Sequence, residues 1–186
     1  MSLFSSTVIT TFVALLFCMA AGHKLYSIKK FLQVVAGYQL VPAPLLAIVA
    51  VVIPLLELVL VVGLLYPVSR IPAAFCAAGL VFFYGVVMAV NLYRGNAAID
   101  CGCQWGEGSM GLSYWHVVRN AIVVSLVLLA IMPGYGSSAA MALTHYIPAT
   151  ALALVILIFY RCFEGLLANV LHPFYQQRNS PSHRSR

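Results

Sequence analysis

The sequence predicts an all-α integral membrane protein, a four- to five-helix transmembrane bundle with an interfacial helix after the first span. Of its 186 residues, 63% are hydrophobic and only 8% are charged, whereas about a quarter of the residues of a soluble domain are charged. Several apolar runs are long enough to cross about 30 Å of hydrocarbon, which takes roughly 20 helical residues. Nine of the ten basic residues lie between and after these runs, and Arg119 lies within one of them. This pattern is typical of membrane proteins and predicts a lipid bilayer, not nucleic acid, as the partner.

Five apolar runs are candidate spans, and the fourth is short. We expect Tyr114, Trp115 and His116 to complete it at the membrane interface, where amphipathic rings are common. The first run ends in small residues, like a secretory signal, but no Lys or Arg precedes it. We therefore expect a retained helix. In chain order the five runs are Phe4–Ala21, Leu45–Leu65, Ile71–Leu92, Val117–Met132 and Ala140–Tyr160.

The segment His23–Leu40 carries Lys24, Lys29 and Lys30, and its apolar residues are spaced to lie on one helical face. We expect it to lie along the membrane interface, with His23 and Lys24 facing the headgroups. The whole bundle is predicted as one domain over residues 1–172, followed by a disordered basic tail over residues 173–186.

A loop that contains Cys101 follows the third span, so it lies on the same side as the segment His23–Leu40. That side collects most of the positive charge, against Arg70 on the other side, and the positive-inside rule therefore places this loop in the cytoplasm. The basic residues on the loop side are Lys24, Lys29, Lys30, Arg94, Arg161, Arg178, Arg184 and Arg186.

The most distinctive chemistry is the sequence Cys101-Gly102-Cys103, which lies in the segment Tyr93–Gly108 between the third and fourth spans. A disulfide between residues two apart needs a sharp bend, which Gly102 permits. Such a ring would be strained and easily reduced, and is therefore suited to exchange. These two cysteines are the candidate catalytic redox pair. The neighbouring Asp100 disfavours a thiolate, whereas Arg94 or Arg119 would favour one if folded nearby.

Two other interpretations of the cysteines stay open. They could be incidental, or two thiolates together with His116 could bind Zn²⁺ or Cu⁺. A fourth ligand is not evident in the sequence, so we predict no metal site. A third hypothesis is a membrane carrier in which the cysteines have no role and Glu57 lines a polar path.

Polar side chains within spans are costly, so each is a functional candidate. Glu57 lies near the middle of the second span, where it could receive a proton, bind a partner's cation or accept a hydrogen bond from a neighbouring helix. Asn91, Arg119 and Asn120 fall at the loop-side ends of the third and fourth spans. We expect them to clamp these ends through hydrogen bonds and so to support the cysteine loop.

A series of short motifs follows in order over residues 14–132: Ala21-Gly22-His23-Lys24-Leu25, Tyr38-Gln39-Leu40-Val41-Pro42, Glu57, Asn91-Leu92-Tyr93-Arg94-Gly95, Ile99-Asp100-Cys101-Gly102-Cys103 and Arg119-Asn120. This series resembles the methylamine utilization (MauE) family, whose wider relatives are DoxX-like membrane proteins. The most specific part is the Arg-Gly pair followed by Asp-Cys-Gly-Cys. In relatives an aromatic residue and Gly often follow the cysteines directly, whereas Gln104 intervenes here.

The resemblance implies an accessory protein of the bacterial inner membrane rather than a conventional enzyme. Its client would be the beta (small) subunit of methylamine dehydrogenase, a periplasmic protein with many disulfides and a tryptophan tryptophylquinone. The implied role is processing, transport or maturation of that subunit, beside a thioredoxin-like MauD-type partner. No cofactor is expected, although a quinone stays open. A periplasmic client favours cysteines on the outer side, while the charges place them inside, so both orientations remain open.

Overall fold

The computed structural model describes residues 3–96, 111–131 and 143–179. This part of the chain forms helices and contains no strand, so the predicted all-α fold is confirmed. A short 3₁₀ turn, Ala43–Leu45, precedes the third helix. The α-helices are α1 (Leu3–Tyr26), α2 (Ile28–Gly37), α3 (Leu46–Leu65), α4 (Arg70–Tyr93), α5 (Tyr114–Ala130) and α6 (Leu143–Asn179).

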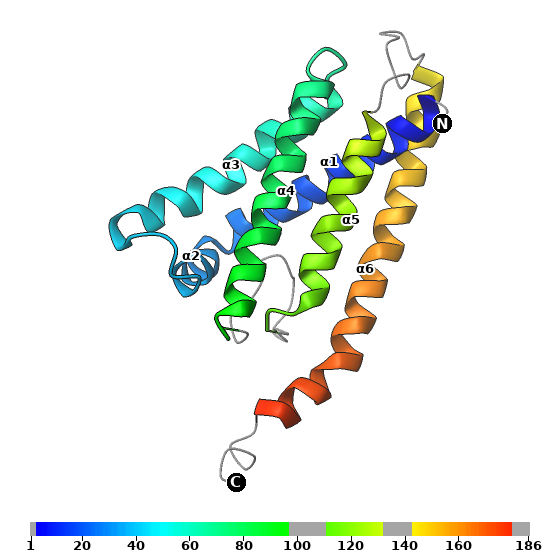
Figure 1. Cartoon of the computed structure of the whole chain (residues 1–186). Helices are drawn as coiled ribbons and strands as arrows, with labels where there is room; N and C mark the ends of the chain where they lie inside the picture. The colour runs from blue at the N-terminus through cyan, green and yellow to red at the C-terminus, as the bar shows by residue number, and fades with distance from the viewer. Residues whose placement is uncertain (1–2, 97–110, 132–142, 180–186) are drawn as a thin grey trace.

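Four of the described helices, α1, α3, α4 and α6, contain stretches long and apolar enough to cross a membrane, and α5 is a shorter apolar helix of 17 residues. Each of the five predicted spans therefore overlaps one of these helices. The prediction of a four- to five-helix membrane bundle is confirmed, and the chain is a multi-pass membrane protein. In the figures, α2, the end of α4, the start of α5 and the C-terminus of α6 lie toward one end of the bundle, here called the loop end (Figure 1).

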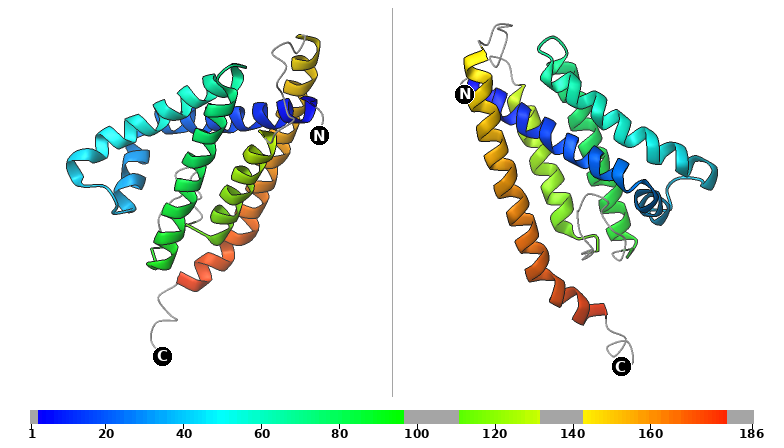
Figure 2. Two further views of the ribbon diagram at one scale, coloured as in Figure 1. Left: turned by 45° about the horizontal axis from the view of Figure 1, so that its top comes forward. Right: turned by 180° about the vertical axis from the view of Figure 1, so that it is seen from behind.

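Helix α1 is central to the packing. It crosses obliquely behind α4 and α5 (Figures 1 and 2) and contacts α2, α3, α5 and α6. Its buried side chains, including Phe12, Val13 and Phe17, belong to the main hydrophobic cluster, which also contains small residues of α4 such as Ala74 and Ala77. Small side chains let helices approach closely in a membrane, where dispersion contacts drive association.

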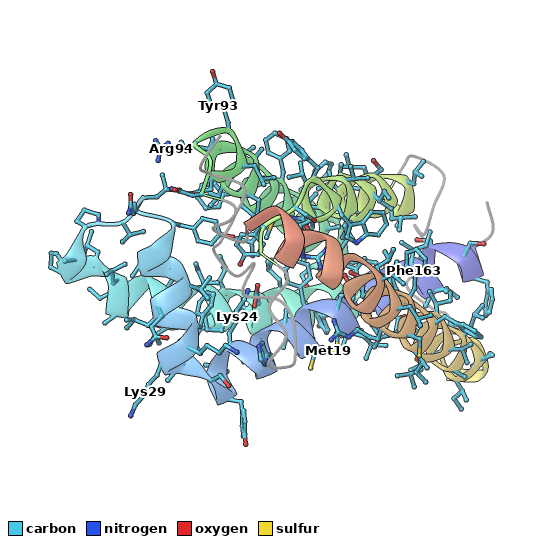
Figure 3. All side chains as sticks on the ribbon, turned by 90° about the horizontal axis from the view of Figure 1, so that it is seen from below. Met19, Lys24, Lys29, Tyr93, Arg94 and Phe163 are labelled. Atoms are coloured by element: carbon cyan, nitrogen blue, oxygen red, sulfur yellow. The ribbon has the colours of Figure 1, made fainter. Side chains whose placement is uncertain are left out.

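Helix α1 continues to Tyr26, beyond the predicted end of the first span at Ala21. The expected amphipathic helix is therefore shorter than predicted and is α2, which begins after Ser27. Its buried residues are Phe31, Val34 and Val35, while Lys29 projects outward (Figure 3). In the last turn of the longer helix the Lys24 side chain is buried, whereas Leu25 and Tyr26 are exposed.

Helix α6 continues past the predicted end of the fifth span at Tyr160 and reaches Asn179. Residues 173–179 of the predicted disordered tail are therefore helical. Residues 180–186 lie outside the described part of the chain. The longer helix includes Arg161 and Glu164, which follow the predicted fifth span, and brings both to the bundle.

Candidate functional site

The structure divides the predicted site residues into three groups. Asp100, Cys101, Gly102 and Cys103 lie outside the described residues. Arg94 is exposed at the end of α4 and projects outward (Figure 3). The other three, Glu57, Arg119 and Asn120, are buried, and all line one cavity between helices.

The chain leaves α4 through a fixed turn. Gly95 has a φ of 79°, its N–H donates to the carbonyl of Leu92 at 3.1 Å, and the N–H of Asn96 donates to the carbonyl of Asn91 at 3.0 Å. These two bonds form a Schellman motif, in which a left-handed glycine ends a helix. The Asn-Leu-Tyr-Arg-Gly motif thus has a local structural reason, because it sets the direction in which the cysteine segment begins.

The other end of the cysteine segment is also anchored. Leu112 is 1% exposed and belongs to a hydrophobic cluster with residues of two other segments. These are Val34 of α2, Tyr38, which directly follows α2, and Met88 of α4. The backbone N–H of Ser113 donates to Nδ1 of the fully buried His116 at 3.3 Å. His116, the third ligand of the metal hypothesis, therefore has one ring nitrogen engaged in capping α5.

Glu57 forms the first of two buried ionic clusters. Its Oε1 accepts an ion-paired hydrogen bond from Nζ of Lys24 and a second hydrogen bond from the hydroxyl of Tyr84, at 2.9 Å. The side chains of Lys24 and Glu57 are 3% and 1% exposed. The Lys24 ammonium also lies 4.8 Å from the ring centroid of Tyr84 and 5.2 Å from that of Phe31, which adds cation–π attraction. The Glu57 cluster, Lys24, Glu57 and Tyr84, ties α1, α3 and α4 together.

Glu164 forms the second cluster on α6. Its Oε1 accepts hydrogen bonds from Nη1 of Arg119 and from the hydroxyl of Tyr160, each at 2.7 Å. Its Oε2 accepts a bond from Nη1 of Arg161 at 2.9 Å. Tyr160 and Arg161 lie one helical turn before Glu164, so α6 supplies three of the four members. The Glu164 cluster, Arg119, Tyr160, Arg161 and Glu164, ties α5 to α6.

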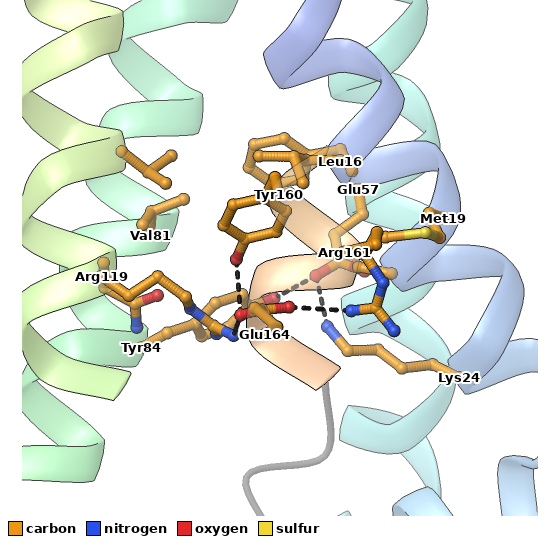
Figure 4. A pocket seen from close by; sticks show the side chains of 14 residues that line it. Leu16, Met19, Lys24, Glu57, Val81, Tyr84, Arg119, Tyr160, Arg161 and Glu164 are labelled. Atoms are coloured by element: carbon orange, nitrogen blue, oxygen red, sulfur yellow. Dashed lines mark hydrogen bonds and ion pairs between the residues drawn. The ribbon is translucent and has the colours of Figure 1, made fainter. Parts of the chain in front are cut away.

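Both clusters line one cavity of about 90 Å³, the polar cavity. Figure 4 shows Glu164 in the middle of the view, with Lys24, Glu57 and Arg161 to its right and Arg119 to its left. The remaining wall is mostly apolar and includes Leu16, Phe17, Val81 and Val123, together with the amide of Asn120. The arrangement suits binding of a small polar or charged group beside apolar surface. Within the described residues no group of three metal-binding side chains is found.

A second cavity of about 420 Å³ lies between α2, α3 and α4. Its lining is almost entirely apolar, and the residues it shares with the polar cavity are Lys24 and Tyr84. The Glu57 cluster therefore forms a polar partition between an apolar cavity on one side and the polar cavity on the other.

The expected interhelical hydrogen bonds are present in part. Asn120 donates to the sulfur of Met88 at 3.5 Å, which joins α5 to α4 as expected. Arg119, however, bonds to Glu164 and joins α5 to α6. The amide nitrogen of Asn91 donates within α4, to the carbonyl of Val87 at 3.0 Å.

Five members of the two clusters were not among the predicted site residues: Lys24, Tyr84, Tyr160, Arg161 and Glu164. The headgroup-facing position predicted for Lys24 is wrong, because α1 continues past it and packs it against Glu57. Glu164 lies beyond the predicted end of the fifth span at Tyr160, so the predicted spans do not place it in the bundle. A signal for Glu164 exists in the sequence: it is one of only four acidic residues, and it follows a Tyr-Arg pair at helical spacing.

The chain is similar to known proteins over most of its length. A family model described as methylamine utilisation protein MauE matches residues 2–133. A methylamine utilization protein MauE from Paracoccus denitrificans is 35% identical over 134 residues, which cover 72% of each chain. The protein of that name from Methylophilus methylotrophus is 42% identical over 63% of this chain and 62% of its own length. The one from Methylorubrum extorquens is 38% identical over 65% of this chain and 67% of its own. No solved structure matches this chain.

Proposed function

Because the chain belongs to the methylamine utilisation protein MauE family, we propose that it is an inner-membrane accessory protein for maturation of the methylamine dehydrogenase beta subunit. Its chemical step is thiol–disulfide exchange at Cys101 and Cys103. The observation that carries this proposal is the position of Cys101-Gly102-Cys103, in the connection between two packed membrane helices whose ends are both anchored. Functional residues are often found in loops held by a rigid scaffold.

The exchange needs no group beyond the two proteins. A thiolate of a thioredoxin-like partner attacks one sulfur of the Cys101–Cys103 disulfide and forms a mixed disulfide. The second partner thiolate then releases the pair. The partner's dithiol is oxidised by two electrons, and Cys101 and Cys103 take up those electrons and two protons. The reverse direction reduces the partner by the same steps.

The Schellman turn at Gly95 and the cap at Ser113 support this proposal because they limit where the connecting segment can go. Both anchors lie at the loop end of the bundle, so the proposal expects the partner protein to bind there.

The proposal is tested by replacing Cys101 or Cys103 with Ser in cells that produce methylamine dehydrogenase. We expect either variant to lower the yield of disulfide-bonded beta subunit, while thiol labelling of the wild-type pair increases after reduction. Cys76→Ser is the matched control, because Cys76 is a free and exposed cysteine of α4 away from the loop end. Normal beta-subunit maturation in both loop variants would refute the proposal.

A membrane carrier is the second candidate, and the position of Glu57 on the wall of the polar cavity favours it. In a carrier, Glu57→Gln abolishes transport of the solute while Cys101→Ser has no effect. In the maturation protein the order is reversed: Cys101→Ser blocks maturation, and Glu57→Gln acts only through stability.

A further inference from the structure

The polar cavity carries more positive than negative charge. Its described lining contains three cations, Lys24, Arg119 and Arg161, and two carboxylates, Glu57 and Glu164. Four of these side chains are 10% exposed or less, and Arg161 is 27% exposed. At neutral pH the described lining therefore has one positive charge in excess.

An excess positive charge is expensive inside a membrane protein, where little water compensates it. The three cations also bring many N–H groups to the lining, since a lysine ammonium has three and each guanidinium five. A bound anion with one negative charge would balance the charge of the lining and accept hydrogen bonds from it.

We propose that the polar cavity binds a singly charged oxyanion. A cavity of about 90 Å³ far exceeds the roughly 10–15 Å³ that one water requires, and suits a carboxylate or phosphate group. Arg161 is the most exposed cation, so the anion enters beside it. The chemistry is shared by two sources, the phosphodiester group of an anionic phospholipid and a soluble carboxylate. This site is independent of the thiol exchange proposed above.

The test measures thermal unfolding of the purified full chain in maltoside micelles without phospholipid. A ligand that binds the folded state raises the melting temperature with its concentration. One arm adds phosphatidylglycerol, with diacylglycerol as the control that has the same chains and no phosphate. The other arm adds sodium acetate, with sodium chloride at equal ionic strength. We expect a saturable rise in one oxyanion arm that its control lacks, and the arm that gives it identifies the source.

Opposite changes of charge at the Glu164 cluster sharpen the test. Arg161→Gln removes the excess charge, so the oxyanion concentration needed for half of the rise should increase roughly tenfold or more, as for loss of a charged hydrogen bond. Glu164→Gln raises the excess and should lower that concentration. Arg161→Lys keeps the charge and should bind like the wild type. Arg70→Gln is the matched control, because Arg70 donates to Tyr146 away from the cavity.

Two results would overturn the inference. One is a wild-type chain whose melting temperature responds no more to either oxyanion than to its control. The other is a response that Arg161→Gln leaves unchanged, or that Glu164→Gln weakens as Arg161→Gln does. A purely structural role of the cluster predicts the second pattern, since both variants would then only lower stability.

Discussion

Replacing Lys24 by Met removes one partner of the buried Glu57 pair and preserves most of the side-chain volume. The Glu57 carboxylate, 1% exposed, would then lose its cation and keep the Tyr84 hydroxyl as a donor. Removing one member of a buried ion pair costs about 3–5 kcal/mol, because the remaining charge stays buried. We expect Lys24→Met to lower the free energy of unfolding by that amount.

The measurement is a titration of the purified protein with sodium dodecyl sulfate in mixed micelles, followed by circular dichroism. Lys29→Met is the control, since Lys29 is exposed on α2, and it should change stability by less than about 0.5 kcal/mol. Replacing Glu57 by Met in the Lys24→Met background removes the unpaired charge and should restore most of the loss.

If Lys24→Met lowers the free energy of unfolding by less than about 1 kcal/mol, this reasoning is refuted, because a loss that small is typical of solvent-exposed ion pairs. A double variant less stable than Lys24→Met alone would refute it as well. In either case the pair seen in the structure would contribute little, and Lys24 would be held in place by its contacts with α2 and α4.

Two glycine substitutions test the packing and the loop geometry by the same titration. Gly63→Ala places a Cβ 2.8 Å from the Cβ of Ala73 and should cost about 1–3 kcal/mol as α3 and α4 separate; a variant as stable as the wild type would contradict this close approach. Gly95→Ala puts a side chain at a φ of 79° and should cost about 1–2 kcal/mol. Gly22→Ala is the control for both, because a Cβ there meets nothing within 4 Å; Gly22 lies within α1, so alanine should keep stability or raise it by up to about 1 kcal/mol.

Hydropathy predicts the spans well because each depends on the composition of a continuous segment. The apolar run Leu45–Leu65 predicts α3 almost to the residue, and the spacing of apolar residues predicts α2 as an amphipathic helix. Helix ends are less predictable, because local composition does not show whether a polar side chain finds a partner. The charge of Lys24 predicts that α1 ends near this residue. The helix continues because Glu57, 33 residues later in the sequence, compensates the charge of Lys24.

The ionic clusters depend on contacts between distant segments, which no local pattern contains. Arg119 and Glu164 are 45 residues apart, and the sequence alone does not indicate that α5 and α6 are neighbours at these positions. Glu57 could be identified from its cost within a span, but its cation could not. The roles of Cys101 and Cys103 stay predictions, because both lie outside the described residues.

The Lys24–Glu57 pair also has a consequence for how the protein is made. Lys24 leaves the ribosome before Glu57, so α1 enters the bilayer while its cation has no partner. Because Lys24 lies in the last turns of α1, its long side chain can extend to the headgroups during this interval. The arrival of α3 then draws the charge inward. Arg119 precedes Glu164 in the same order, in the second turn of α5. Each cation is thus close to a helix end, where its side chain can stay at the bilayer surface until a later helix brings its carboxylate partner.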